Sequence, residues 1–319
     1  MLGVQIDHGT LTLRADLPRP EPRPGWTRVR VLRAGICATD LALARGYLDF
    51  AGTPGHEFVG LALDGPFAGE RVVGEINAGC GVCTSCANDF SRHCAQRSVL
   101  GIVGLPGAFA EEIALPTRNL HCVPQSLATE DALFAEPLAA AFAIPERLAL
   151  VPGTHALVVG DGKLGLLCAH VLALQGLEVT VAGRHPERAA LLPRNAHHRT
   201  DLFDASTAVQ ERFEIAVEAT GRGAMLEQVA RLVRPRGTLV LKTTCEGKSP
   251  LNLSSIVVDE ITVVGSRCGP LAPALRALAE ASVPVSGLVA ATYALGDAAQ
   301  AFAHARRGGV LKIVIDSSA

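Results

Sequence analysis

The segment from residue 154 to residue 184 constrains the fold more than any other part of this chain. It reads THALVVGDGKLGLLCAHVLALQGLEVTVAGR, which predicts an apolar strand, a glycine turn, a long apolar helix and a second apolar strand. The apolar runs FEIAVEATG, GTLVLKTT and ITVVGSR follow as further buried strands, with helical stretches between several of them. This alternation predicts an α/β domain over residues 138–268, in which helices cover both faces of a parallel sheet.

The glycine turn has the spacing G-x-G-x-x-G, formed by Gly160, Gly162 and Gly165. The spacing alone is weak evidence, but here it follows a predicted strand and opens a helix. Glycines allow a tight turn and a close approach of the backbone to a pyrophosphate, which the first helical N–H groups can bind. We therefore expect a dinucleotide site that also includes Lys163 and Leu164. The alternative is an ordinary glycine turn.

The second strand of this unit ends at Ala182 and is followed by Gly183 and Arg184. An acidic residue at this end would accept a hydrogen bond from the ribose 2′-hydroxyl of NAD. Gly183 provides no such group, and a guanidinium at residue 184 can bind a 2′-phosphate. The sequence therefore favours NADP over NAD, unless Arg184 is an ordinary surface arginine.

The composition limits the classes of partner. The net charge of −2 and the pI near 6.6 give no electrostatic case for nucleic acid or an anionic membrane. The first residues do not resemble a signal peptide, and no apolar run approaches the roughly 18–20 residues that a bilayer requires. We expect a cytoplasmic protein, in which nine cysteines are more consistent with metal binding than with a disulfide framework.

One loop, GCGVCTSCANDFSRHC, concentrates four of these cysteines at residues Cys80, Cys83, Cys86 and Cys94. Four thiolates can surround a zinc ion tetrahedrally at about 2.3 Å and leave no open position, so the predicted site is structural. A disulfide pair is the alternative and fits the crowded CxxCxxC spacing poorly. A zinc-ribbon module for nucleic acid is disfavoured because no basic run lies nearby.

The chain outside residues 138–268 predicts a second domain. WTRVRVLRAG, ERVVGEI and AFAEEIAL have the pattern of strands, whereas LAPALRALAEA and LGDAAQAFAHARRG predict amphipathic helices, and VLKIVID predicts a closing strand. We therefore expect a discontinuous, β-rich domain formed by residues 1–137 and 269–319.

Potential ligands for a second metal are dispersed through this domain. AGICATD contains Cys37, Thr39 and Asp40, PGHEFVG contains His56 and Glu57, and FAEPLAAA contains Glu136. A cysteine, a histidine and a carboxylate brought together by the fold would leave one zinc position open for a substrate, as in catalytic sites. Each residue alone is more often a core or surface residue, and spacing does not bring them together.

In combination these motifs resemble the zinc-dependent medium-chain dehydrogenase/reductase family, the alcohol dehydrogenase superfamily. The resemblance runs nearly end to end, through GICATD, PGHEFVG, the four-cysteine loop, GAFAEEIALP and VVGDGKLG. AEPLAAA is most similar to the sorbitol, glucose and threonine dehydrogenase branch. The family implies a Rossmann domain, a GroES-like catalytic domain, two zinc ions per chain, NAD or NADP, and a homodimer or homotetramer.

The resemblance also implies residue roles. Cys37 and His56 look like direct ligands of the catalytic zinc, and Glu57 and Glu136 compete for the carboxylate role. Asp40 resembles the carboxylate that orients His56, and Thr39 resembles the hydroxyl that touches the substrate oxygen. The implied activity is reversible hydride transfer between an alcohol or polyol, or its ketone or aldehyde, and NAD(P).

The chain departs from the family in three respects: it is shorter than most relatives, it lacks the acidic residue at position 183, and it lacks a histidine near the first zinc motif. Many relatives have a relay histidine five residues after the ligand cysteine, where this chain has Ala42. Two alternatives stay open, of which Ala42 favours the second, whereas Cys37, His56 and Glu136 count against the first. The first is a zinc-independent quinone or enone reductase of the same superfamily, and the second is a non-catalytic nucleotide-binding protein of the same fold.

Overall fold

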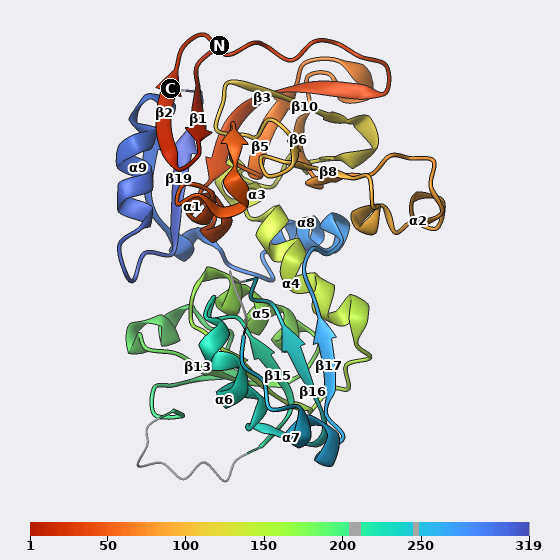
Figure 1. Ribbon diagram of the computed structural model, residues 1–319, viewed down its shortest axis with the longest axis vertical. Helices are drawn as coiled ribbons and strands as arrows, with labels where there is room; N and C mark the ends of the chain where they lie inside the picture. The colour runs from red at the N-terminus through yellow and green to blue at the C-terminus, as the bar shows by residue number, and fades with distance from the viewer. Residues whose placement is uncertain (204–211, 245–248, 319) are drawn as a thin grey trace. The chain divides into compact units, whose positions relative to one another are not determined.

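The computed structural model describes residues 1–203, 212–244 and 249–318 (Figure 1). The chain forms two compact units: residues Met1–Glu136 with Leu271–Ala319, and residues Pro137–Pro270. Cys245 lies outside the described residues. Among the described residues, no helix has the length and apolar character needed to cross a membrane.

The unit formed by residues 137–270 contains a six-stranded parallel sheet in its described part, in the order β14-β13-β12-β15-β16-β17. In chain order this is 3-2-1-4-5-6, the doubly wound order of dinucleotide-binding domains. The strands are β12 (His155–Val159), β13 (Glu178–Ala182), β14 (Ala196–Arg199), β15 (Phe213–Glu218), β16 (Val233–Leu241) and β17 (Thr262–Gly265). The helices are α5 (Lys163–Leu174), α6 (Leu226–Ala230) and α7 (Leu253–Val258).

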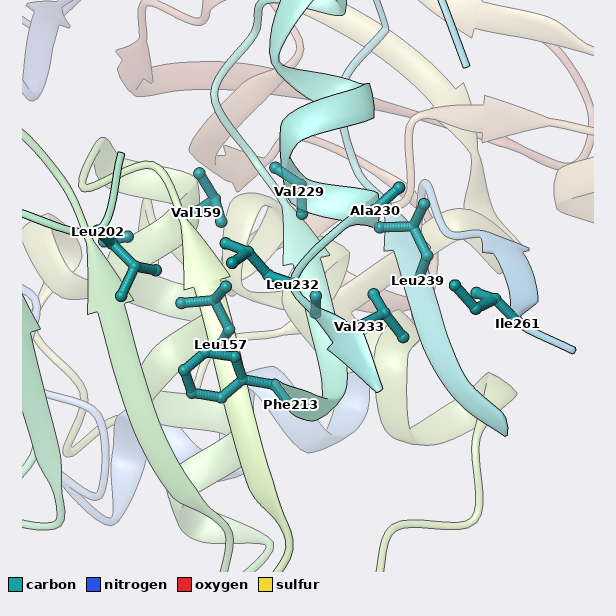
Figure 2. Close-up of a cluster of buried hydrophobic side chains, with 12 residues drawn as sticks. Leu157, Val159, Leu202, Phe213, Val229, Ala230, Leu232, Val233, Leu239 and Ile261 are labelled. Atoms are coloured by element: carbon teal, nitrogen blue, oxygen red, sulfur yellow. The ribbon is translucent and has the colours of Figure 1, made fainter. Parts of the chain in front are cut away.

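The predicted strand–turn–helix–strand segment is confirmed as β12, the glycine turn, α5 and β13. Every residue of α5 from Gly165 to Leu172 is buried, which explains why its sequence is apolar all round. On one face of the sheet Leu157 and Phe213 pack with Val229 of α6 and Leu232 (Figure 2). This cluster packs α6 against the sheet that contains β12, the strand that the glycine turn follows.

The prediction that ITVVGSR is a buried strand is wrong. It forms β17, but Thr262, Val263 and Gly265 are exposed. β17 is the last strand of the sheet, so it lacks a neighbour on one side among the described strands. Apolar residues alone do not distinguish such an edge strand from a central one.

The other unit is β-rich. Its main sheet has the order β11-β6-β5-β3-β19-β18, with β10 also paired to β3. β3 pairs antiparallel with β19 from the C-terminal end of the chain, so this unit is built from both ends of the sequence. The strands are β1 (Gly3–Asp7), β2 (Thr10–Arg14), β3 (Trp26–Gly35), β4 (Ala51–Gly52), β5 (Glu57–Ala62), β6 (Arg71–Gly74), β7 (Asn77–Ala78), β8 (Ser98–Leu100), β9 (Gly104–Leu105), β10 (Glu112–Pro116), β11 (Leu120–Cys122), β18 (Val289–Ala294) and β19 (Lys312–Asp316).

The helices of this unit are mostly short. They are α1 (Ala38–Leu43), α2 (Thr84–Ala87), α3 (Thr129–Ala132), α8 (Leu271–Ala279) and α9 (Ala298–Ala305), and α4 (Ala135–Arg147) crosses the boundary between the units. The sequence predicts α8, α9 and the strands β3, β6, β10 and β19 in the right places. Cys37 directly precedes α1, and His56 directly precedes β5.

Candidate active site and zinc loop

The glycine turn has the close backbone packing that its spacing predicts. Gly160 has a φ of +111°, which favours glycine, and a Cβ added to Gly165 would lie 1.8 Å from the carbonyl oxygen of Gly160. Gly162 directly precedes α5, whose first residues are Lys163 and Leu164. The turn therefore presents the N-terminus of a buried helix at the carboxyl ends of the strands, where a pyrophosphate binds in this type of sheet.

A carboxylate that the sequence analysis does not identify, that of Asp161, lies beside the end of β13. Gly183 has no side chain, but a Cβ there would lie 2.2 Å from the carboxyl group of Asp161. Asp161 comes from the glycine turn, so its carboxylate occupies the space beside the end of β13. Arg184 is exposed at the same end. Asp161 is the first variable residue of G-x-G-x-x-G, and its place between two glycines is the only sequence signal that marks it.

The structure brings three of the dispersed ligand candidates together. Cys37 is the residue before α1, and His56 and Glu57 lie at the start of β5. One ligand atom from each residue lies within 4.8 Å of the others. His56 and Glu57 are buried, whereas Cys37 is half-buried. A thiol, an imidazole and a carboxylate at these separations form the donor set of an open zinc site.

Asp40 connects the two segments that carry these residues. Its buried carboxylate accepts hydrogen bonds from the backbone N–H of Cys37 at 2.8 Å and of Gly55 at 3.1 Å. The Nδ1 atom of His56 lies 3.4 Å from Asp40 Oδ1 and has no hydrogen-bond partner. Asp40 therefore holds the α1 loop against the β5 loop and is the carboxylate nearest the imidazole, the place of the group that orients a metal-bound histidine.

The electrostatics of this site favour a cation. Burial lowers the pKa of His56, but the neighbouring charges of Asp40 and Cys37 outweigh burial and raise the pKa well above 6.5. A buried imidazole gains a proton there only because the surrounding groups supply negative charge. The same negative charge suits a divalent metal, so the residues present fit a zinc ion.

A buried lysine also contacts Glu57, and no sequence motif marks this lysine. Lys312 of β19 is fully buried and forms an ion pair with the Oε2 atom of Glu57. Burial lowers the pKa of Lys312 to about 8, against the opposing charges of Cys37 and Asp40. A Cβ on Gly35 would lie 2.6 Å from Glu57 Oε2, so glycine leaves the room that this pair requires.

The remaining site candidates lie as follows. The Oγ1 atom of Thr39, in α1, is 3.9 Å from the Cys37 sulfur, which places a hydroxyl beside the predicted ligand. Glu136 lies in the first turn of α4 and is not a member of the group formed by Cys37, His56 and Glu57. Glu57 is therefore the carboxylate that the described residues bring to the thiol and the imidazole.

The four-cysteine loop forms a second cluster, remote in sequence from Cys37. The sulfur of Cys83 lies 3.6 Å from that of Cys86 and 3.7 Å from that of Cys94, and Cys80 and Cys86 are 4.0 Å apart. Tetrahedral zinc at about 2.3 Å from each sulfur requires separations of about 3.8 Å. Backbone N–H groups of Val82 and Cys83 lower the pKa of Cys80 to about 6, which favours the thiolate that binds metal.

Two protein families match this chain, one in each half of the sequence. Residues 23–125 match the family described as the alcohol dehydrogenase GroES-like domain, and residues 164–282 match the family described as zinc-binding dehydrogenase. The first match contains the α1 and β5 loops and the cysteine loop. The second begins at the N-terminus of α5.

Individual relatives cover nearly the whole chain. The L-threonine 3-dehydrogenase of Streptomyces coelicolor is 32% identical over 96% of this chain and 96% of its own. The sorbitol dehydrogenase of Halalkalibacterium halodurans is 26% identical over 98% of each chain. Among solved structures, an alcohol dehydrogenase from Thermus sp. ATN1 superposes with a TM-score of 0.87, at 26% identity and over 99% of each chain. The protein therefore belongs to the zinc-type medium-chain alcohol dehydrogenase superfamily.

Proposed function

We propose that this protein is a zinc-dependent alcohol or polyol dehydrogenase that transfers hydride reversibly between its substrate and a nicotinamide cofactor. The observation that carries the proposal is the grouping of Cys37, His56 and Glu57 within 4.8 Å, with Asp40 beside the imidazole. This donor set disfavours a zinc-independent quinone or enone reductase, for which these ligands would have no purpose. It also disfavours a non-catalytic nucleotide-binding protein.

The chain's own residues have separate tasks in this reaction. Cys37, His56 and Glu57 would hold the catalytic zinc, with Glu136 as the alternative carboxylate. When bound, zinc acts as a Lewis acid that lowers the pKa of a coordinated hydroxyl. Thr39 is placed to accept the proton of the substrate hydroxyl and pass it outward. Because Ala42 stands where many relatives have a relay histidine, the proton would continue through a ribose hydroxyl of the cofactor and water, or through another group.

We assign the second zinc to the cysteine loop, which gives two zinc ions per chain. Four sulfurs fill the coordination sphere of that ion, so its role is to stabilise the loop. Four cysteines that bind zinc and form no disulfide are consistent with a reducing compartment, which supports a cytoplasmic location.

The proposed function is tested by a screen of alcohols, polyols and their ketones with NADP(H) and NAD(H). We expect turnover that a chelator abolishes and that added zinc restores. Turnover of quinones or enones after zinc has been removed would instead support the zinc-independent reductase. Nucleotide binding without turnover of any of these substrates would support the non-catalytic protein.

We further propose that NADP is preferred over NAD. Arg184 is exposed at the end of β13, and position 183 has no carboxylate of its own. Arg184→Ala is expected to lower the ratio of kcat/KM for NADPH to that for NADH about tenfold, because a charge-assisted hydrogen bond to a phosphate contributes about 1.5–3 kcal/mol. Arg194→Ala, a replacement in the same unit before β14, is the control. An unchanged ratio in Arg184→Ala would remove this arginine from the cofactor site.

We also propose that the protein is a homodimer or homotetramer. α7 exposes Leu253, Val257 and Val258, the two valines at 74% and 79% exposure, and Val263 of the neighbouring edge strand β17 is 39% exposed. Exposed apolar residues beside a free sheet edge favour association with a second copy. Sedimentation is expected to give at least twice the 33.2 kDa mass of the chain, and Val258→Asp is expected to lower that mass. A wild-type monomer would contradict the proposal.

A further inference from the structure

The carboxylate of Asp161 lies where a dinucleotide-binding domain selects its cofactor. The residue belongs to the glycine turn, yet its side chain reaches the end of β13. A Cβ on Gly183 would lie 2.2 Å from its Cγ and Oδ2 atoms, so no side chain fits at residue 183 while Asp161 is in place. An acidic residue at this end of the second strand normally accepts the ribose 2′-hydroxyl of NAD.

Several donors hold this carboxylate in place. The backbone N–H of His185 donates to Asp161 Oδ2 at 2.8 Å, and the ring Nδ1 of the same residue lies 3.1 Å from Oδ1. Arg188 donates to Oδ1 at 3.2 Å and to the backbone carbonyl oxygen of Asp161 at 2.7 Å. The Nε2 atom of His198, at the edge strand β14, lies 3.3 Å from Oδ2.

These contacts keep the carboxyl group charged although its side chain is only 8% exposed. Burial raises the pKa of Asp161, but hydrogen bonds from His185 and the charge of Arg188 outweigh burial and lower it. The group is therefore an anion at neutral pH. A negative charge here would repel a pyrophosphate bound at the glycine turn. The buried guanidinium of Arg188 offsets part of this charge.

We infer that Asp161 supplies, from the glycine turn, the negative charge that position 183 lacks, and that it opposes Arg184 in the choice between NADP and NAD. The inference rests on the proposed function only in requiring that the glycine turn binds a dinucleotide. It holds whichever cofactor the wild-type protein prefers, because it concerns the direction in which one charge shifts the preference.

The charges near the end of β13 indicate in which direction Asp161 shifts the preference between NADP and NAD. Arg184 and Arg188 contribute two positive charges and Asp161 one negative charge. Arg199 and Asp201 at the end of β14 pair with each other. Asp161→Asn removes the negative charge and keeps the size of the side chain. A 2′-phosphate carries almost two negative charges and gains from the loss of a negative charge, whereas the uncharged 2′-hydroxyl of NAD exchanges a charged acceptor for the weaker amide oxygen of asparagine. Asp161 therefore limits the NADP preference that Arg184 favours.

The test compares wild-type protein and Asp161→Asn at one fixed pH and ionic strength, by kcat/KM with NADPH and with NADH. We expect the NADPH/NADH ratio to rise about tenfold, chiefly through a lower KM for NADPH. The matched control is Glu178→Gln, which removes a charge at the opposite end of β13 and is expected to leave the ratio unchanged. An unchanged ratio in Asp161→Asn would overturn the inference. A lower ratio would also overturn it, since Asp161 would then position donors for the 2′-phosphate.

A binding measurement separates this inference from the proposed catalytic function. Calorimetry with 2′,5′-ADP and with ADP reports the 2′-phosphate contribution without any hydride transfer. Asp161→Asn is expected to bind 2′,5′-ADP about tenfold more tightly relative to ADP, even if the wild-type protein prefers NADH or turns over no alcohol. If the asparagine variant does not fold, Asp161→Ser provides a smaller neutral residue for the same comparison. Equal selectivity in the folded variant and the wild type would refute the role of Asp161.

Discussion

Replacing Cys37 with serine is expected to lower kcat by about three orders of magnitude. The thiolate is the softest of the three proposed ligands, and loss of a Lewis acid worth several kcal/mol at the substrate oxygen corresponds to a rate loss of this size. The affinity for the cofactor is expected to stay within about twofold of wild type, because the glycine turn lies in a separate compact unit. The measurements are steady-state turnover and titration of the nucleotide by fluorescence.

The matched control is Cys122→Ser, the same replacement at an exposed cysteine in β11 of the same unit. It is expected to retain wild-type turnover. Retained turnover in Cys37→Ser would refute the assignment of Cys37 as a ligand. Equal losses in both variants would show that serine acts on the fold of the unit and not on the site.

The second large effect is expected from Lys312→Met, which should lower the free energy of unfolding by about 3–5 kcal/mol. Lys312 and Glu57 are both buried and pair with each other, so methionine would leave a carboxylate in the interior without its partner. Removing one member of a buried ion pair has a cost of this size, whereas exposed pairs contribute about 0–1 kcal/mol. The measurement is urea denaturation of samples freed of the catalytic zinc, because that ion would itself be a partner of Glu57 and would be lost from a Glu57 variant.

Two further variants identify the cause of this loss. Arg14→Met breaks an ion pair with Asp16 whose side chains are 48% and 68% exposed, and it is expected to change stability by less than about 1 kcal/mol. In the double variant Lys312→Met/Glu57→Gln the buried charge is absent, so part of the lost stability should return. A double variant no more stable than Lys312→Met would show that packing around Lys312, and not the stranded charge, explains the loss.

The sequence predicted those parts of the fold that depend on local pattern. β12, the glycine turn, α5 and β13 follow from apolar runs and glycine spacing, because each element is specified by residues adjacent in the chain. The burial of β17 is predicted wrongly, because an apolar strand can have the same sequence pattern at the edge of a sheet as at its centre. Burial depends on neighbours that a single strand does not specify.

The sequence predicts the proposed metal ligands of the candidate site, but it does not predict the groups that hold them in place. Cys37 and His56 stand in recognisable motifs, but their proximity depends on Asp40 joining two loops. Lys312 is separated from Glu57 by 255 residues, and the pairing of β19 with β3 brings the two side chains together. The sequence does not mark Asp161 because its partners come from two later segments, residues 185–188 and β14.

The central claim, that this chain holds a catalytic zinc as well as a structural one, is tested most directly by the zinc content of the purified protein. Elemental analysis of protein prepared without chelator or added metal is predicted to give near two zinc ions per chain. Near one zinc per chain, with no second equivalent and no activity regained when zinc is added, would contradict the account. It would leave only the cysteine loop filled and favour the zinc-independent and non-catalytic alternatives.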